Sequence, residues 1–201
     1  IDMPAAPSAV EVIADESANP AFIAADFLSQ AEHGVDSQAM LVTASESIVE
    51  PVMQAIREQL DRLPRKEITE KSLSHSRLIV LKDKQEVIDF TNLYAPEHLI
   101  IQTTDYADIA GQVENAGSVF MGPYTPESAG DYASGTNHTL PTNGYAKAYS
   151  GVNLDSFIKK ITFQEITADG IRLLGGTIRT MAANEQLDAH KNAVTIRLNT
   201  L

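Results

Sequence analysis

Three segments decide the fold: VEVIA (Val10–Ala14), PAFIAADFLSQAEH (Pro20–His33) and MLVT (Met40–Thr43). The first and third are nearly continuous runs of β-branched and aliphatic residues, as in strands that are buried on both faces. The middle segment has the spacing of an amphipathic helix, with Asn19 as its cap, Pro20 at its first position and Gly34 as a left-handed residue after its end. A strand, a helix and a strand in this order predict a parallel sheet flanked by helices.

The same alternation continues to Phe120. Further strands are expected at Leu78–Leu81, Leu99–Gln102 and Ser118–Met121, and further helices at Ser47–Arg62, Lys84–Tyr94 and Tyr106–Glu114, with a short exposed helix within residues 65–76. The predicted fold class is therefore α/β, with a Rossmann-like parallel sheet.

The composition changes after Met121, because residues 122–151 are rich in Gly, Pro, Ser, Thr, Asn and Tyr. A polar segment of this length is more often a functional loop region than a linker. From Val152 the pattern becomes helical, with a short strand expected at Ile161–Gln164. We place a domain boundary near Ser150, which separates residues 1–150 from a small, mainly helical tail domain of residues 151–201.

Composition also excludes several classes of function. The 201 residues contain no cysteine, so thiolate metal sites and disulfides are ruled out. A net charge of −12 argues against a nucleic-acid partner, and no apolar run reaches the roughly 20 residues that a membrane span needs. A cytoplasmic protein is expected. Because the sequence begins at Ile1 without a methionine, we expect a truncated or processed part of a longer polypeptide.

Two constellations precede the polar segment. Asp26, Gln30 and His33 share one stripe of the first helix, so Gln30 and His33 could offer an amide oxygen and an imidazole to one metal; the alternative is a solvated helix face. Glu97 and His98 could act as an acid–base pair, or be a surface Glu beside a His packed on a strand edge. They lie at a strand start, whereas sites in parallel sheets usually lie beyond the carboxyl ends.

Two more constellations follow Met121. Asp131 and His138 lie in the polar segment after the carboxyl end of a strand, in either a functional loop or an ordered loop that satisfies its own polar groups. Glu185 and His190 are five residues apart and cannot share a helix face. A break near Leu187–Asp188, with Asp188 capping a new helix, would bring them together; otherwise they are solvent-facing residues at a helix end.

Five motifs in order resemble those of the histidinol dehydrogenase family, and the resemblance runs from about residue 1 to residue 201. The motifs are Ser29-Gln-Ala-Glu-His-Gly34, Tyr94-Ala-Pro-Glu-His-Leu99, Pro126-Glu-Ser-Ala-Gly-Asp-Tyr132, Gly135-Thr-Asn-His138 with Leu140-Pro-Thr142, and Ala189-His-Lys-Asn-Ala193. The resemblance implies oxidation of L-histidinol to the aldehyde and then to L-histidine, with two NAD reduced and one Zn²⁺ per site. Residues 1–150 would then be the C-terminal part of the family's main metal- and substrate-binding domain.

The resemblance also implies roles for individual residues. The zinc ligands would be Gln30, His33, Asp131 and His190, and the acid–base pair Glu97 and His98. The substrate would contact Ser8, Gln30, His33, His98, Asp131, His138, Glu185 and His190. In the family the tail crosses a two-fold axis, so a homodimer with exchanged tails is expected.

This chain departs from the family pattern in two respects. Ala6-Pro-Ser-Ala9 stands where the family usually has Gly-Pro-Ser-Glu. Family members are also about twice as long, and the part absent here holds NAD; the chain itself has no Gly-x-Gly-x-x-Gly motif. Alone, it is expected to be inactive and prone to associate, since half a sheet leaves an edge uncovered. The alternative is a non-catalytic metal-binding or dimerisation module.

Overall fold

The computed structural model describes residues 3–4 and 6–201, which form two compact units that are divided after Ile158. The division follows Ile158, eight residues beyond the boundary that composition suggested at Ser150. Ile1, where truncation or processing was expected, lies outside the described residues.

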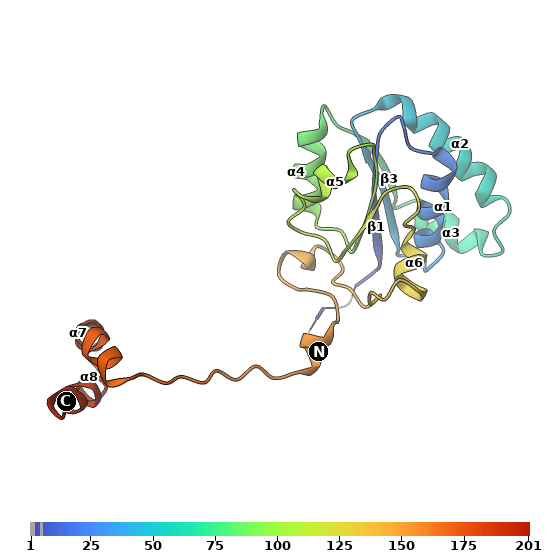
Figure 1. The fold of residues 1–201 in the computed structure, drawn as a ribbon. Helices are drawn as coiled ribbons and strands as arrows, with labels where there is room; N and C mark the ends of the chain where they lie inside the picture. Colours follow the sequence, from blue (N-terminus) through green and yellow to red (C-terminus); the bar gives the residue numbers. More distant parts are fainter. Residues whose placement is uncertain (1–2, 5) are drawn as a thin grey trace. The chain divides into compact units, whose positions relative to one another are not determined.

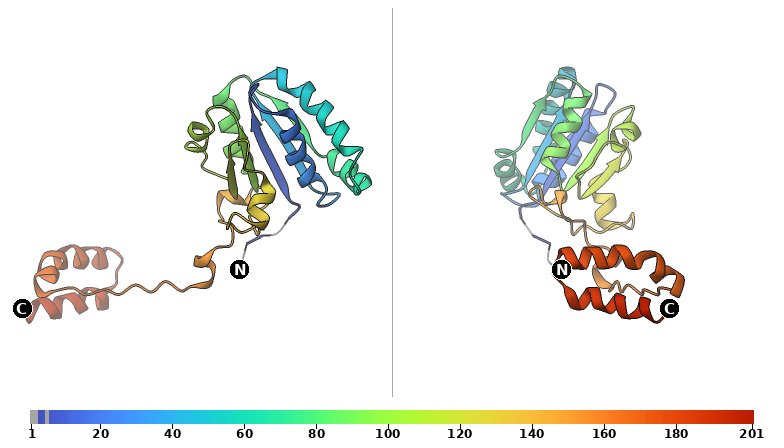
Figure 2. Two further views of the ribbon diagram at one scale, coloured as in Figure 1. Left: turned by 45° about the vertical axis from the view of Figure 1, so that its right-hand side comes forward. Right: turned by 90° about the vertical axis from the view of Figure 1, so that its left-hand side faces the viewer.

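The first unit contains a five-stranded sheet in the order β3-β2-β1-β4-β5, and every pairing within it is parallel. The strands are β1 (Ala9–Ala14), β2 (Gln38–Thr43), β3 (Arg77–Val80), β4 (His98–Gln102) and β5 (Ser118–Met121). All five strands lie within two residues of the predicted bounds, so the α/β prediction is confirmed. The sheet stands between layers of helices (Figures 1 and 2).

Most helices of the first unit also lie where the sequence predicts them. They are α1 (Pro20–Ala31), α2 (Val49–Leu60) after a 3-10 turn η1 (Glu46–Ile48), α3 (Lys66–Leu73), α4 (Lys84–Tyr94), α5 (Tyr106–Ala110) and α6 (Glu127–Tyr132). Asn19 caps α1 by accepting a hydrogen bond from the Ala21 N–H, as predicted. The left-handed conformation expected at Gly34 is wrong, because α1 ends through a right-handed Glu32 and Gly34 has no positive φ.

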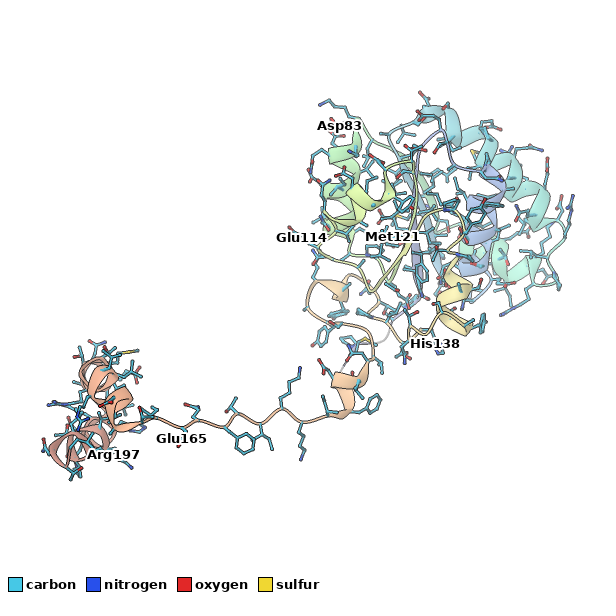
Figure 3. All side chains as sticks on the ribbon, viewed as in Figure 1. Asp83, Glu114, Met121, His138, Glu165 and Arg197 are labelled. Carbon is cyan, nitrogen blue, oxygen red and sulfur yellow. The ribbon has the colours of Figure 1, made fainter. Side chains whose placement is uncertain are left out.

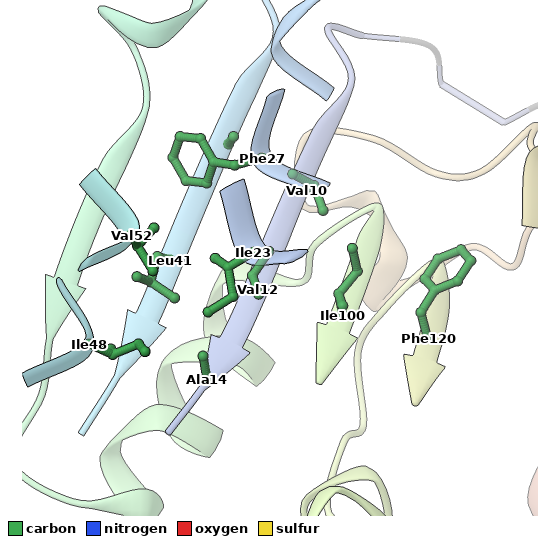
Figure 4. Packing of buried hydrophobic residues seen from close by; sticks show 11 residues of the cluster. Val10, Val12, Ala14, Ile23, Phe27, Leu41, Ile48, Val52, Ile100 and Phe120 are labelled. Atoms are coloured by element: carbon green, nitrogen blue, oxygen red, sulfur yellow. The ribbon is translucent and has the colours of Figure 1, made fainter. Parts of the chain in front are cut away.

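Two hydrophobic clusters cover the two faces of the sheet. On one face, Val10 and Val12 of β1 pack against Ile23 and Phe27 of α1 and Val52 of α2 (Figure 4). On the other face, residues of β2 and β4 pack against α4 and α5. Strands β1 and β4 are buried along their whole length, which explains their mainly apolar sequences; the polar residues within them, among them Glu11 and His98, are buried as well.

The second unit is a pair of helices, α7 (Ala168–Asn184) and α8 (Asp188–Asn199), which pack side by side (Figure 1). Gly175 allows the close approach, since a Cβ there would lie 2.7 Å from Leu198 Cδ1. The predicted break before Asp188 is confirmed, but Leu187 is the cap and Asp188 is the first helical residue. The strand expected at Ile161–Gln164 is wrong: the described residues 161–164 are extended without a pairing partner. No helix among the described residues could cross a membrane.

Candidate metal and acid–base site

The candidate site of the first unit lies at the amino ends of the strands. Helix α1 runs back from the end of β1, so Gln30 and His33 at its end return to the level where β1 and β4 begin. Glu97 and His98 stand at the start of β4, and α6 lies beside the end of the sheet at which β1 begins (Figure 1). The expectation that a site lies at the carboxyl ends is therefore wrong for this cluster, because the segment after β5 carries α6 back.

His33, Glu127 and Asp131 form a group that could hold a metal ion. Each offers one ligand atom, and these atoms all lie within 4.8 Å of one another. His33 Nδ1 lies 2.9 Å from the Ser29 carbonyl oxygen, which can only accept, so Nδ1 carries the proton. Its Nε2 therefore has a free lone pair, as a ligating imidazole needs. One nitrogen and two carboxylates are a donor set suited to zinc.

Gln30 is fully buried beside this group. With its carboxamide oriented to satisfy its neighbours, the nitrogen donates to Glu127 Oε1 and Oε2 at 3.0 and 3.2 Å, and the oxygen faces Ser8 Oγ at 3.0 Å. Asp26, one turn earlier, is also buried and accepts from Gln102 Nε2 at 2.8 Å. The solvated-face alternative is thus wrong for these two residues, although His33 itself is exposed.

Glu97 and His98 are both buried, so the alternative of a surface Glu is wrong. Glu97 Oε2 accepts from Ser8 Oγ at 2.5 Å and from the Ala9 N–H at 2.8 Å. His98 Nδ1 lies 3.4 Å from the Ala9 carbonyl oxygen, and 3.7 and 3.8 Å from carboxylate oxygens of Glu97 and Glu127. Its Nε2 is buried with no hydrogen-bond partner among the described residues.

Several carboxyl groups of the cluster are buried close to one another, and this raises their pKa values. Burial, together with the nearby carboxyls of Asp131, Glu97 and Asp26, raises the pKa of Glu127 to about 8. Burial likewise raises the pKa of Asp26 to about 7 and that of Glu97 above its usual range. A cation would relieve this excess of negative charge, which is a second reason why the residues present fit a divalent metal. Burial lowers the pKa of His98 to about 4, so its imidazole is neutral near pH 7.

The other predicted site residues have different surroundings. His138 is exposed on the loop after α6 (Figure 3), close enough to His98 to depress its pKa. Glu185 caps the end of α7 and His190 lies in the first turn of α8, both exposed within the second unit. Their joining to Gln30, His33 and Asp131 stays a prediction.

Glu127 is the site residue that sequence reasoning missed. It is 2% exposed and contacts members of both predicted groups. A signal was present, since Glu127 precedes Asp131 by four residues and this spacing places both on one face of a helix.

Comparisons with known proteins cover nearly the whole chain. The family model described as Histidinol dehydrogenase matches residues 1–198. The chain is 68% identical over 201 residues to the histidinol dehydrogenase of Bacteroides thetaiotaomicron, covering 100% of this chain and 47% of the relative. It is 58% identical over 202 residues to the chloroplastic histidinol dehydrogenase of Arabidopsis thaliana, covering 100% of this chain and 43% of that relative.

A solved structure is similar as well. The crystal structure of histidinol dehydrogenase from Elizabethkingia anophelis superimposes with a TM-score of 0.94 at 57% identity, over 99% of this chain and 46% of that one. The chain thus spans a little under half the length of the relatives that it matches.

Proposed function

Because this chain belongs to the histidinol dehydrogenase family, we propose that it supplies the metal-binding and acid–base residues of an enzyme that oxidises L-histidinol to L-histidinaldehyde and then to L-histidine. The observation that carries the proposal is the convergence of an amide, an imidazole and carboxylates beside a buried Glu97–His98 pair. NAD, which accepts the hydride in each oxidation, would be held mainly by residues outside this chain.

The metal would be one zinc ion held by Gln30, His33 and Asp131 of one subunit, with His190 as a fourth ligand. The burial of Gln30, the orientation of the His33 ring and the crowding of carboxyls support this assignment. Zinc, when bound, would orient the nitrogen donors of the substrate and polarise its reacting group. Residues 1–150 would form part of the main domain, and residues 151–201 the tail.

His98 would remove the alcohol proton as hydride leaves the carbinol carbon. Its contact with the Ala9 carbonyl oxygen favours a proton on Nδ1, so the unpartnered Nε2 has the free lone pair that a base needs. Its lowered pKa keeps the ring neutral and able to accept a proton.

Glu97 would then take a proton from the water that attacks the aldehyde carbon, before hydride leaves a second time. Ser8 and the Ala9 N–H hold one of its oxygens in place. Ser8, His138 and Glu185 would line the substrate pocket, which retains the reactive aldehyde between the two oxidations.

The active form would be a homodimer in which the tails are exchanged. Apolar side chains on α7 and α8 are exposed within the second unit, among them Leu173, which is 82% exposed, and Met181. A two-helix unit with such a surface gains stability by packing on a partner. Glu185 and His190 would then complete the site of the other subunit.

The decisive test is a chimera in which this chain replaces the matching 201 residues of the Bacteroides thetaiotaomicron relative. With L-histidinol and NAD it should form NADH, measured by absorbance. His98→Asn should abolish this activity, whereas His75→Asn, at an exposed histidine, should leave it unchanged. A chimera that binds zinc but never reduces NAD would contradict the enzyme assignment and favour the metal-binding or dimerisation module.

Tail exchange has its own test. His98→Asn and His190→Asn chimeras, each inactive alone, should recover up to about a quarter of full activity when their subunits are mixed, since half of the dimers then carry one intact site. Mixtures that stay inactive although hybrid dimers form would argue that His190 serves its own subunit.

A further inference from the structure

Glu127 occupies a position that none of the proposed roles uses. It begins α6, is 2% exposed, and directs both carboxylate oxygens at the end of the Gln30 side chain, at 3.0 and 3.2 Å. One of these oxygens also lies 3.8 Å from His98 Nδ1. A single buried carboxylate therefore stands between a residue assigned to the metal and the residue assigned as the base.

The contact with Gln30 has a chemical consequence because the two ends of a carboxamide have the same shape. Only the surroundings decide whether oxygen or nitrogen points in a given direction, and only the oxygen can bind a metal. In its ionised form, which a bound cation favours, Glu127 can only accept hydrogen bonds, so the Gln30 end that faces it is then the nitrogen. The Ser8 hydroxyl on the other side has a single proton, which it can give either to Glu97 Oε2 or to the Gln30 oxygen, so it does not impose an orientation as two carboxylate oxygens do.

We propose that Glu127 is a positioning residue for metal binding: by holding the Gln30 nitrogen with two hydrogen bonds, it keeps the Gln30 oxygen available to the cation. This inference rests on the metal site of the proposed function. The arrangement corresponds to the outer partners that orient metal ligands in other proteins, whose loss weakens metal affinity about 10- to 100-fold.

The test compares zinc affinity in the full chain, measured by competition with a chromophoric chelator. Glu127→Leu should bind zinc 10- to 100-fold more weakly, while Glu127→Gln, which keeps one accepting oxygen, should lose less. Glu11→Leu is the matched control, since Glu11 is a similarly buried glutamate that contacts Thr91 of α4 and none of the proposed metal ligands. The zinc affinity of this variant should be unchanged. The visible spectrum of the cobalt-substituted chain should change in Glu127→Leu and not in the control.

A double-mutant cycle separates positioning from direct ligation. If Glu127 acts through Gln30, then Gln30→Ala with Glu127→Leu should bind zinc within about twofold of Gln30→Ala alone. Losses that multiply would overturn the proposal and make Glu127 a ligand itself. If circular dichroism shows that Glu127→Leu does not fold, the cycle is run with Glu127→Gln instead. Zinc affinity equal to that of the wild-type chain in Glu127→Gln, or losses that multiply in the double variant, would again overturn the proposal.

The failure of this inference is distinguishable from that of the proposed function. A wild-type chain without zinc affinity would overturn the metal site and the role of Glu127 together. A wild-type chain that binds zinc, with an affinity that does not change when Glu127 is replaced, would overturn the role of Glu127 alone.

Discussion

Replacing Glu11 by Gln should change the pH dependence of stability in a defined direction. Glu11 lies on β1, is 0% exposed, and packs on the α4 side of the sheet, where Oε1 accepts from Thr91 Oγ1 and Oε2 has no hydrogen-bond partner among the described residues. Burial raises its pKa from 4.5 to about 8. Between these values the folded chain binds more protons than the unfolded chain, so the stability contributed by this group falls as pH rises.

The size of the effect follows from the two pKa values. One pKa unit corresponds to about 1.4 kcal/mol, and between about pH 5 and pH 8 the unfolded carboxyl is mostly ionised while the folded one is mostly protonated. Ionisation of Glu11 should therefore cost the wild-type chain roughly 3 kcal/mol of unfolding free energy over this range. Glu11→Gln cannot ionise and should lack this loss.

Urea denaturation of both chains across this pH range provides the measurement. As pH rises, the unfolding free energy of Glu11→Gln should increase by roughly 3 kcal/mol relative to that of the wild-type chain. Any destabilisation by the new amide that does not depend on pH leaves this change unaffected. Parallel curves would refute the reasoning and show that Glu11 ionises in the folded state near its ordinary pKa.

Three further predictions concern the helix cap, a close backbone approach and the sheet edge. Asn19→Ala removes the hydrogen bond to the Ala21 N–H and should cost about 1 kcal/mol in urea unfolding; an unchanged midpoint would contradict the capping role. Gly117→Ala should cost about 1–3 kcal/mol, because its Cβ would lie 2.5 Å from the Glu97 carbonyl oxygen; a fully stable variant would show that β4 and β5 separate without penalty. Met121, 41% exposed on the edge strand β5, should promote association of the 201-residue chain; Met121→Lys should shift sedimentation toward smaller species, and an unchanged distribution would exclude this edge.

Local chemistry explains why the elements could be predicted so closely. Strand β5 and helix α4 have the predicted bounds, since β-branched runs and capping residues act over a few neighbours along the chain. The strand predicted at residues 161–164 is wrong because neighbours along the chain do not decide whether a strand forms. Ile161–Gln164 has an apolar pattern but no adjacent strand to pair with, and a strand needs such a partner.

The sequence by itself determined the α/β class, the parallel direction of the strands, the family resemblance and the motifs that contain Gln30, His33, Glu97, His98 and Asp131. Only the tertiary structure decided that α1, β4 and α6 meet at the amino ends of the strands, and that Glu127 stands between Gln30 and His98. Periodicity reports which face of an element is apolar, but burial and pKa depend on which elements pack against that face. The environment of Glu127 is set by residues distant along the chain, such as Gln30, 97 positions away, and His98, 29 positions away, which no local pattern could reveal.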